Sequence, residues 1–347
     1  MAKRGVVVLF VILGLLMGHG LAQSPEQWSK NLEVDPAYKQ RMSVSPTLQI
    51  PPKIAYLNDS KIICAYYDDA IGDSVAAGSR PRFHVLEIDA VSGHLENSLS
   101  FSAADDLAAI GVVSNGFVVL AGGELSKYDI DFNKTATFST PHITGGHVNF
   151  WALDVPPGGS QIALYRRSDT GKDQELIRLS NTNLARLSDE KAPFGRDASV
   201  SNSSYILDTT QDYCDDCLVH YLADDVVFVE SRNRYFIEST AKKRLAKGGL
   251  SGWALDLTHA FHATRLAFLT GRYSGFEGHV PTSVVGKVVI IDWSLKKVIA
   301  EIPVAVSTGN PSAGLRQSAL ALSPDGTQLT LLLDSQLHTY LIGSGAR

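Results

Sequence analysis

The sequence predicts an all-β protein built from repeated four-stranded units, and two internal similarities indicate this. The tetrapeptide Trp-Ala-Leu-Asp at residues 151–154 recurs at residues 253–256, and residues 152–164 align without a gap on residues 319–331. Both aligned segments read as strand, turn and strand, because proline presets φ for a turn and glycine tolerates positive φ. A unit that recurs along a chain is typical of folds assembled from stacked supersecondary elements.

Six units can be counted, each opening with a β-hairpin, and each of the first five continues into a second strand pair. Apolar runs or alternating apolar residues flank every turn, as expected for buried strands. The sixth unit is incomplete, because only Leu337–Ile342 follows its hairpin. The segment Val44–Ile50 is predicted to supply the missing strand and close a ring. The turns of the six opening hairpins are at residues 58–60, 114–116, 156–159, 223–225, 259–262 and 323–326.

Two motifs carry a family resemblance. Ala321–Leu329 (ALSPDGTQL), together with the turn Asp89–Gly93 (DAVSG), resembles the repeats of WD-repeat and YVTN-type β-propellers. The resemblance implies a β-propeller of six to seven four-stranded blades around a central channel, with any seventh blade in residues 189–217. It covers residues 50–343 as repeat architecture only, because the Trp-Asp dipeptide that names the WD repeat is absent from its expected position. The alternative is a two-sheet sandwich or a pair of β domains, and a sandwich gives no reason for the sequence to repeat.

The first residues predict export. Lys3 and Arg4 precede an uncharged apolar run at residues 5–17, and Gly20 and Ala22 have the spacing of a signal-peptidase site. The apolar run is too short for an ordinary transmembrane helix, and no later run approaches that length. The predicted organisation is therefore a signal peptide at 1–22, an N-terminal tail at 23–43 and a propeller domain at 44–343. The mature protein is expected in the periplasm or secreted, with no membrane span.

Charge argues against nucleic acid as a partner. The net charge is −5, and cleavage of a signal peptide carrying Lys3 and Arg4 changes it to −7. An acidic protein repels a phosphate backbone, and no block of lysine and arginine provides a local exception.

The longest connections are predicted between the second and third strands of a unit or between units, and both kinds emerge on one face of a propeller. They are residues 67–81, 140–146, 165–173, 188–216, 270–286 and 307–314. Loops beyond the minimal turn length often carry function, and mixed charges with aromatic residues suit recognition of a polar ligand, a glycan or a protein. The candidate ligand-binding residues on this face are Asp68, Asp69, Arg80, Arg82, Arg166, Arg167, Arg272, Tyr273, Glu277 and His279.

Cys214 and Cys217 form the most conspicuous local motif. Haem attachment is excluded because Leu218, not histidine, follows the second cysteine, and a zinc site lacks a second ligand pair. In an exported protein the pair is predicted to form a local disulfide that stiffens a long loop. The third cysteine, Cys64, is predicted to be a buried thiol in a core strand.

No catalytic motif, metal site or cofactor-binding loop stands out, and His259 and His262 are read as parts of a solvated turn. The sequence therefore favours an exported propeller that binds a partner through its loop-rich face. The alternative is a propeller enzyme, such as a quinone-dependent dehydrogenase, a lactonase or a glycoside-active hydrolase, with its site at the channel mouth.

Overall fold

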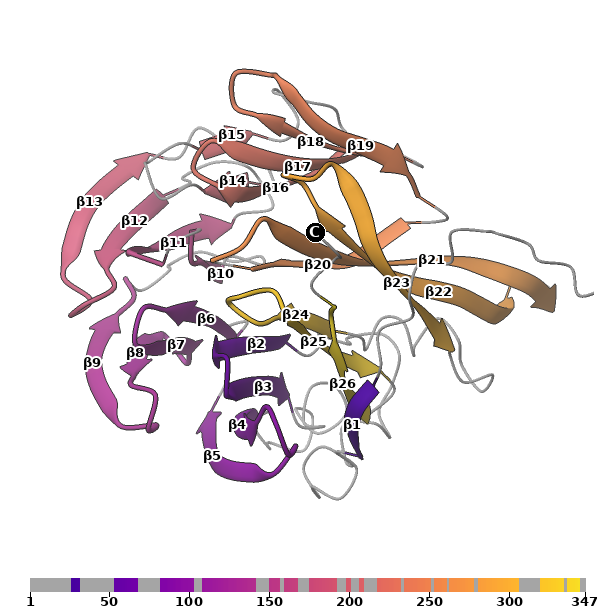
Figure 1. The fold of residues 1–347 in the computed structure, drawn as a ribbon. Helices are drawn as coiled ribbons and strands as arrows, with labels where there is room; N and C mark the ends of the chain where they lie inside the picture. Colours follow the sequence, from indigo (N-terminus) through magenta and orange to yellow (C-terminus); the bar gives the residue numbers. More distant parts are fainter. Residues whose placement is uncertain are drawn as a thin grey trace, which may run out of the picture.

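The computed structural model shows a ring of four-stranded sheets (Figure 1). The residues that it describes are 26–31, 53–67, 82–102, 108–141, 150–156, 159–167, 175–191, 198–200, 206–208, 217–231, 234–250, 253–260, 262–277, 280–305, 319–333 and 336–343.

Six antiparallel sheets make up the ring, so the chain is an all-β propeller of six blades, as the sequence predicted. Blades 1 to 3 are β2(Lys53–Asn58), β3(Lys61–Tyr67), β4(Arg82–Asp89) and β5(Leu95–Ser102); β6(Ala109–Val113), β7(Gly116–Ala121), β8(Glu124–Tyr128) and β9(Lys134–Ser139); and β10(Phe150–Asp154), β11(Gln161–Arg167), β12(Glu175–Ser180) and β13(Arg186–Lys191). Blades 4 to 6 are β16(Cys217–Ala223), β17(Val226–Ser231), β18(Arg234–Ser239) and β19(Arg244–Gly249); β20(Trp253–His259), β21(Arg265–Glu277), β22(Val280–Asp292) and β23(Lys297–Ala305); and β24(Ala319–Leu322), β25(Gln328–Leu333), β26(Gln336–Leu341) and β1(Glu26–Asn31).

An N-terminal strand closes the ring as predicted, but the predicted segment was wrong. The outer strand of blade 6 is β1, which pairs antiparallel with β26, whereas Val44–Ile50 lies outside the described residues. Trp28 explains why this earlier segment fits. Its ring packs on the core between blades 6 and 1, and its Nε1 donates to the carbonyl of Ala90 at 2.7 Å. The propeller therefore includes residues that the sequence pattern assigned to the N-terminal tail.

The described part of residues 189–217 adds no seventh blade. It contains a two-stranded hairpin, β14(Ala198–Val200) with β15(Ile206–Asp208), which forms a sheet of its own.

The turn between the third and fourth strands of a blade, here called the outer turn, is built alike in blades 1 to 5. Each ends on a residue in the left-handed region, and each is preceded by a bulge in the register of the third and fourth strands. This is the geometry of a hairpin loop that ends in a left-handed residue. Only blade 1 uses glycine, as the Asp89–Gly93 motif predicted. The five left-handed residues are Gly93 (φ 70°), Phe132 (φ 64°), Leu184 (φ 58°), Lys242 (φ 61°) and Lys296 (φ 56°).

Aspartates at the start of three outer turns hold the turns together. The Asp89 carboxylate accepts hydrogen bonds from the hydroxyl and the backbone N–H of Ser92, both at 2.6 Å, and these bonds lower the pKa of Asp89. Asp129 and Asp292 accept backbone N–H groups of their own turns in the same way. These bonds satisfy turn N–H groups that strand pairing leaves free.

The core lies between neighbouring blades. One apolar cluster joins blades 1 and 2, and others join blades 2 and 3, 4 and 5, 5 and 6, and 6 and 1. Buried side chains such as Phe117, Phe228 and Phe268 fill these layers, and each contributes about 1.5–3 kcal/mol by leaving water. Cys64 is fully buried in β3, as predicted. The described residues contain no helix with the length and hydropathy of a membrane span.

The strand bounds place the long connections at one face, here called the loop-bearing face, and the short inner and outer turns at the other, here called the turn-bearing face. One predicted loop was wrong. Residues 270–286 are not an extended loop, because β21 and β22 remain paired from Arg265 with Asp292 out to Glu277 with Val280.

Candidate functional site

The predicted binding residues that the structure describes all belong to strand segments at the loop-bearing face. Arg82 begins β4 and is exposed, and Arg166 and Arg167 end β11. Arg272 is the first residue of β21 beyond its pairing with β20. Tyr273 and Glu277 follow in the same strand. Asp68, Asp69, Arg80 and His279 lie outside the described residues. A binding role for these ten residues stays a prediction.

Arg166 has the most defined surroundings of this set. It pairs in register with Trp151 of β10, whose indole Nε1 donates to the carbonyl of Pro141 at 3.1 Å. The Nε of Arg166 is buried and has no hydrogen-bond partner among the described residues. A buried donor without a partner costs about 1–3 kcal/mol, so this Nε is an unsatisfied group within blade 3.

The loop-bearing face also carries a two-stranded ribbon. Pairing of β20 with β21 stops at Gly271, and pairing of β22 with β23 stops at Val285. Residues 272–277 and 280–284 therefore pair only with each other within the described chain, and Figure 1 shows them projecting beyond the ring. A ribbon with two open edges presents unpaired backbone donors and acceptors. This element replaces the loop that the sequence predicted, and it carries three of the predicted residues.

The turn-bearing face contains a cavity that sequence reasoning missed. It has a volume of about 380 Å³ and lies at the mouth of the central channel, where the inner strands and turns of blades 1, 2, 3, 5 and 6 converge. It is lined by Tyr56, Leu57, Val112, Val113, Ser114, Asn115, Gly159, His262 and Pro324. Only ring closure brings these segments together, so no local motif signals the cavity.

Most polar groups at this mouth are hydrogen-bonded to other parts of the propeller. The Tyr56 hydroxyl bonds Thr330 Oγ1 at 2.8 Å, and Thr330 in turn bonds Thr339. Burial raises the pKa of Tyr56 well above its ordinary value, so the phenol stays protonated. The backbone N–H of His262 donates to the carbonyl of Pro324 at 2.8 Å, and the His262 side chain is exposed, in agreement with the solvated turn predicted for it.

One histidine on an inner strand has a strongly lowered pKa. Burial, with a smaller contribution from the charge of Lys53, lowers the pKa of His220 in β16 to about 4. Its side chain keeps some accessible surface even though protein surrounds it. The imidazole is therefore neutral at physiological pH.

The described residues show no group of three histidine, cysteine or acidic side chains placed to hold a metal ion. Cys214 lies outside the described residues and Cys217 begins β16, so the disulfide between them stays a prediction.

Comparison with a solved structure supports the fold. A chain of the crystal structure of the mitotic checkpoint complex superposes with a TM-score of 0.52 and 12% identity, covering 99% of this chain and 100% of that one. A functionally unknown protein from Desulfotomaculum acetoxidans superposes with a TM-score of 0.49 and 11% identity, covering 75% of this chain and 89% of that one. No family model and no curated protein sequence matches this chain. The structural likeness confirms the resemblance to WD-repeat propellers as one of architecture, because identities this low show the fold alone.

Proposed function

We propose that this propeller is an exported binding module that recognises a polar partner, either a protein, a glycan or a small molecule, through its loop-bearing face. The blades form a closed scaffold whose sheet edges lie in protected positions, which suits a rigid platform for recognition. The β-propeller fold itself is consistent with an interaction module.

The ribbon of β21 and β22 is the observation that carries this proposal. An isolated two-stranded hairpin is marginally stable in water, and open edges favour pairing with another chain. The sequence nevertheless extends both strands past the blade to Glu277 and Val280. Binding through such an edge uses main-chain hydrogen bonds for affinity and side chains for selectivity. Arg272, Tyr273 and Glu277 are the residues that we assign to selectivity.

Trimming the ribbon tests the proposal. In the trimmed variant an Asn-Gly turn joins Gly271 to Gly286, its partner in register, which ends β21 and β22 close to the ends of their pairing with β20 and β23. Intact and trimmed proteins would be immobilised, exposed to the extracellular or periplasmic fraction and to a glycan array, and the bound species identified and titrated. We expect a partner of the intact protein whose affinity drops at least tenfold on trimming, while the unfolding temperature stays within a few degrees.

A matched control separates the two faces. Asn115→Ala changes the channel mouth on the turn-bearing face and is expected to leave the partner bound. Equal binding by the trimmed variant, or a partner lost only by the Asn115 variant, would place recognition away from the loop-bearing face and overturn the proposal.

Export rests on the basic, apolar and small-residue order of the first 22 residues. Expression of the full chain followed by N-terminal sequencing is expected to give Gln23 in the periplasmic or extracellular fraction. A product that keeps Met1 in the cytoplasm would contradict export without affecting the binding proposal.

A further inference from the structure

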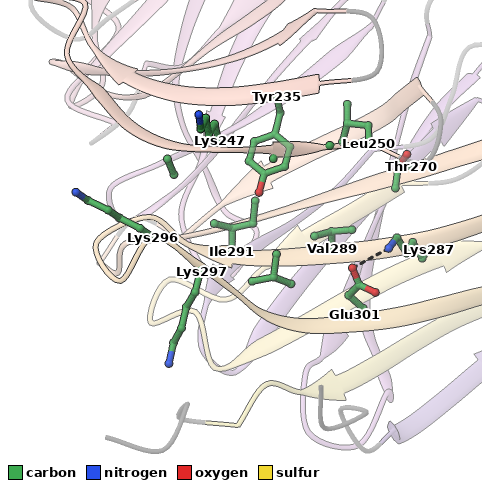
Figure 2. A pocket seen from close by; sticks show the side chains of 14 residues that line it. Tyr235, Lys247, Leu250, Thr270, Lys287, Val289, Ile291, Lys296, Lys297 and Glu301 are labelled. Carbon is green, nitrogen blue, oxygen red and sulfur yellow. Dashed lines mark hydrogen bonds and ion pairs between the residues drawn. The ribbon is translucent and has the colours of Figure 1, made fainter. Parts of the chain in front are cut away.

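A cavity of about 220 Å³ lies between blades 4 and 5, apart from the channel mouth. Its walls are the outer half of blade 4, from β18 and β19, and the broad side of blade 5, from β21 to β23 (Figure 2). Here it is called the blade 4–5 cavity. With about 30 Å³ per water molecule, its volume corresponds to roughly seven waters, which suits a small solute and not a nucleotide.

The left-handed residue of the outer turn explains why this junction is open. In blade 2 that position is Phe132, which packs on Phe117 in the cluster between blades 1 and 2. In blade 3 it is Leu184, buried in the cluster between blades 2 and 3. In blade 5 the same position is Lys296, which is exposed and lines the cavity. A lysine therefore stands where blades 2 and 3 have an apolar side chain; blade 4 also has a lysine, Lys242, at this position.

Glycine in the outer strand of blade 4 adds to the space. Gly248 of β19 lies in register opposite Tyr235, and a Cβ at Gly248 would come within 2.5 Å of the Tyr235 ring and its hydroxyl. The ring lies over the bare backbone, and Figure 2 shows its hydroxyl directed toward blade 5. Because Gly248 and Gly249 have no side chains, the blade 4 side of the cavity is lined by bare backbone, which leaves more space.

The groups around the cavity are predominantly cationic donors. Lys247, Lys296 and Lys297 have no hydrogen bond or ion pair with any described residue, and Lys287 pairs with Glu301 at 2.7 Å. Four lysines against one glutamate give the lining a positive charge. Lysines contributed by both blades, exposed at positions 296 and 297, are suited to attract an anion to the cavity.

Two hydroxyl groups are placed deeper in the junction. Thr270 is fully buried, and its Oγ1 has no hydrogen-bond partner among the described residues. Tyr235 is also buried, and burial together with Glu301 raises its pKa, so its hydroxyl remains a donor. A buried hydroxyl without a partner costs stability unless a ligand or water satisfies it.

We propose that the blade 4–5 cavity is a binding site for a small organic anion that carries several carboxylate or phosphate oxygens. Lys296, Lys297 and Lys247 would neutralise the charge at the mouth, while Tyr235 and Thr270 would donate to oxygens further in. The site is independent of the loop-bearing face, so it supplies a second, small-molecule input to a protein whose partner binds elsewhere.

Isothermal titration calorimetry with citrate and with inorganic phosphate tests this site, with sodium chloride added to hold the ionic strength constant. The intact protein is expected to bind at least one probe saturably with one site per chain, and the two probes distinguish carboxylate from phosphate recognition. The double variant Lys296→Gln with Lys297→Gln is expected to weaken binding about tenfold or more, because it removes two charged donors from the lining. Lys134→Gln, which removes an exposed lysine of blade 2, is the matched control and is expected to bind as the intact protein does.

Two further variants guard against a purely electrostatic surface effect. Thr270→Val removes the buried hydroxyl at nearly constant volume and is expected to weaken binding several-fold without loss of the fold. Lys296→Leu copies Leu184 of blade 3 and is expected to abolish binding while raising the unfolding temperature. The proposal is overturned if neither probe binds the intact protein at millimolar concentration, or if the Thr270 and Lys296 variants bind as the intact protein does.

Discussion

The junctions between blades differ in how they are closed, and the contrast between blades 1–3 and blades 4–5 is informative. At the junction of blades 1 and 2, the Lys61 ammonium donates to the carbonyl of Ile130 in the next outer turn. At the junction of blades 2 and 3, Lys127 donates to the carbonyls of Asn181 and Thr182. The lysines join blades there, whereas at the blade 4–5 junction Lys247, Lys296 and Lys297 have no described partner.

The environments of the two joining lysines also differ. A hydrogen bond to Glu87 raises the pKa of Lys61, whereas burial lowers the pKa of Lys127, which has only carbonyl acceptors. The same link between blades is thus made once with a compensating acid and once without. Two junctions thus add a lysine link to an outer-turn carbonyl, whereas the blade 4–5 junction is joined by its apolar cluster and leaves lysines beside a cavity.

Removing the acid at the first junction is expected to have the largest effect. Glu87 is fully buried, ion-pairs with Lys61 at 2.5 Å and accepts from Asn97 Nδ2 at 2.5 Å. Glu87→Leu leaves both donors without their acceptor and is expected to lower the free energy of unfolding by about 3 kcal/mol. Urea denaturation measures the free energy of unfolding. Glu96→Gln is the control, because that carboxylate lies 3.9 Å from the Lys61 ammonium, farther than Glu87 does. A change below about 1 kcal/mol would mean that Glu87 does not anchor the lysine that joins blades 1 and 2.

Removing the lysine at the second junction is expected to cost less. Lys127→Met keeps the side-chain length but leaves the carbonyls of Asn181 and Thr182 without their donor. Relief of lysine desolvation offsets part of the loss, so we expect destabilisation of about 2 kcal/mol. Hydrogen exchange should show faster opening in blades 2 and 3 than in blade 5. An equal increase of the hydrogen-exchange rates in all blades would contradict a local role for this link.

Acid is expected to weaken blade 4 through His220. The unfolded chain takes up the imidazole proton near pH 6.5, whereas the folded chain does so only near pH 4. Between these values the unfolded state binds more protons, so stability falls as the pH falls, on the order of 2 kcal/mol by pH 4.5. His220→Gln should remove this component from the pH dependence of the unfolding free energy. Identical pH profiles for the two proteins would show that His220 is not buried in the folded state as described.

An exposed pair within one blade is expected to matter least. Lys134 and Glu124 are 2.6 Å apart, and each side chain is 43% exposed. Lys134→Ala should change the unfolding free energy by less than about 1 kcal/mol, because solvent screens the attraction. A loss as large as that of Lys127→Met would show that burial at the junctions is not what distinguishes the two classes of lysine.

Much of the fold follows from local sequence, and the candidate sites largely do not. The hairpin at Ser323–Gly326 and the turn at Asp89–Gly93 were recognisable because proline, glycine and aspartate have direct effects on backbone conformation. Gly159 and Gly326 indeed adopt positive φ. Residues 270–286 were misjudged because polar and small residues weaken the strand signal even where two strands pair with each other.

The sequence by itself determined that this chain repeats an antiparallel four-stranded unit, because strand alternation and turn chemistry act over a few residues. Only the tertiary structure decided which N-terminal segment completes blade 6, since Glu26–Asn31 gains its place from contacts with blade 1 more than 60 residues away. The channel mouth and the blade 4–5 cavity likewise exist only because the ring brings distant segments together. Whether a lysine such as Lys127 or Lys296 joins two blades or faces an open space depends on its neighbours across the junction, and one strand cannot encode that.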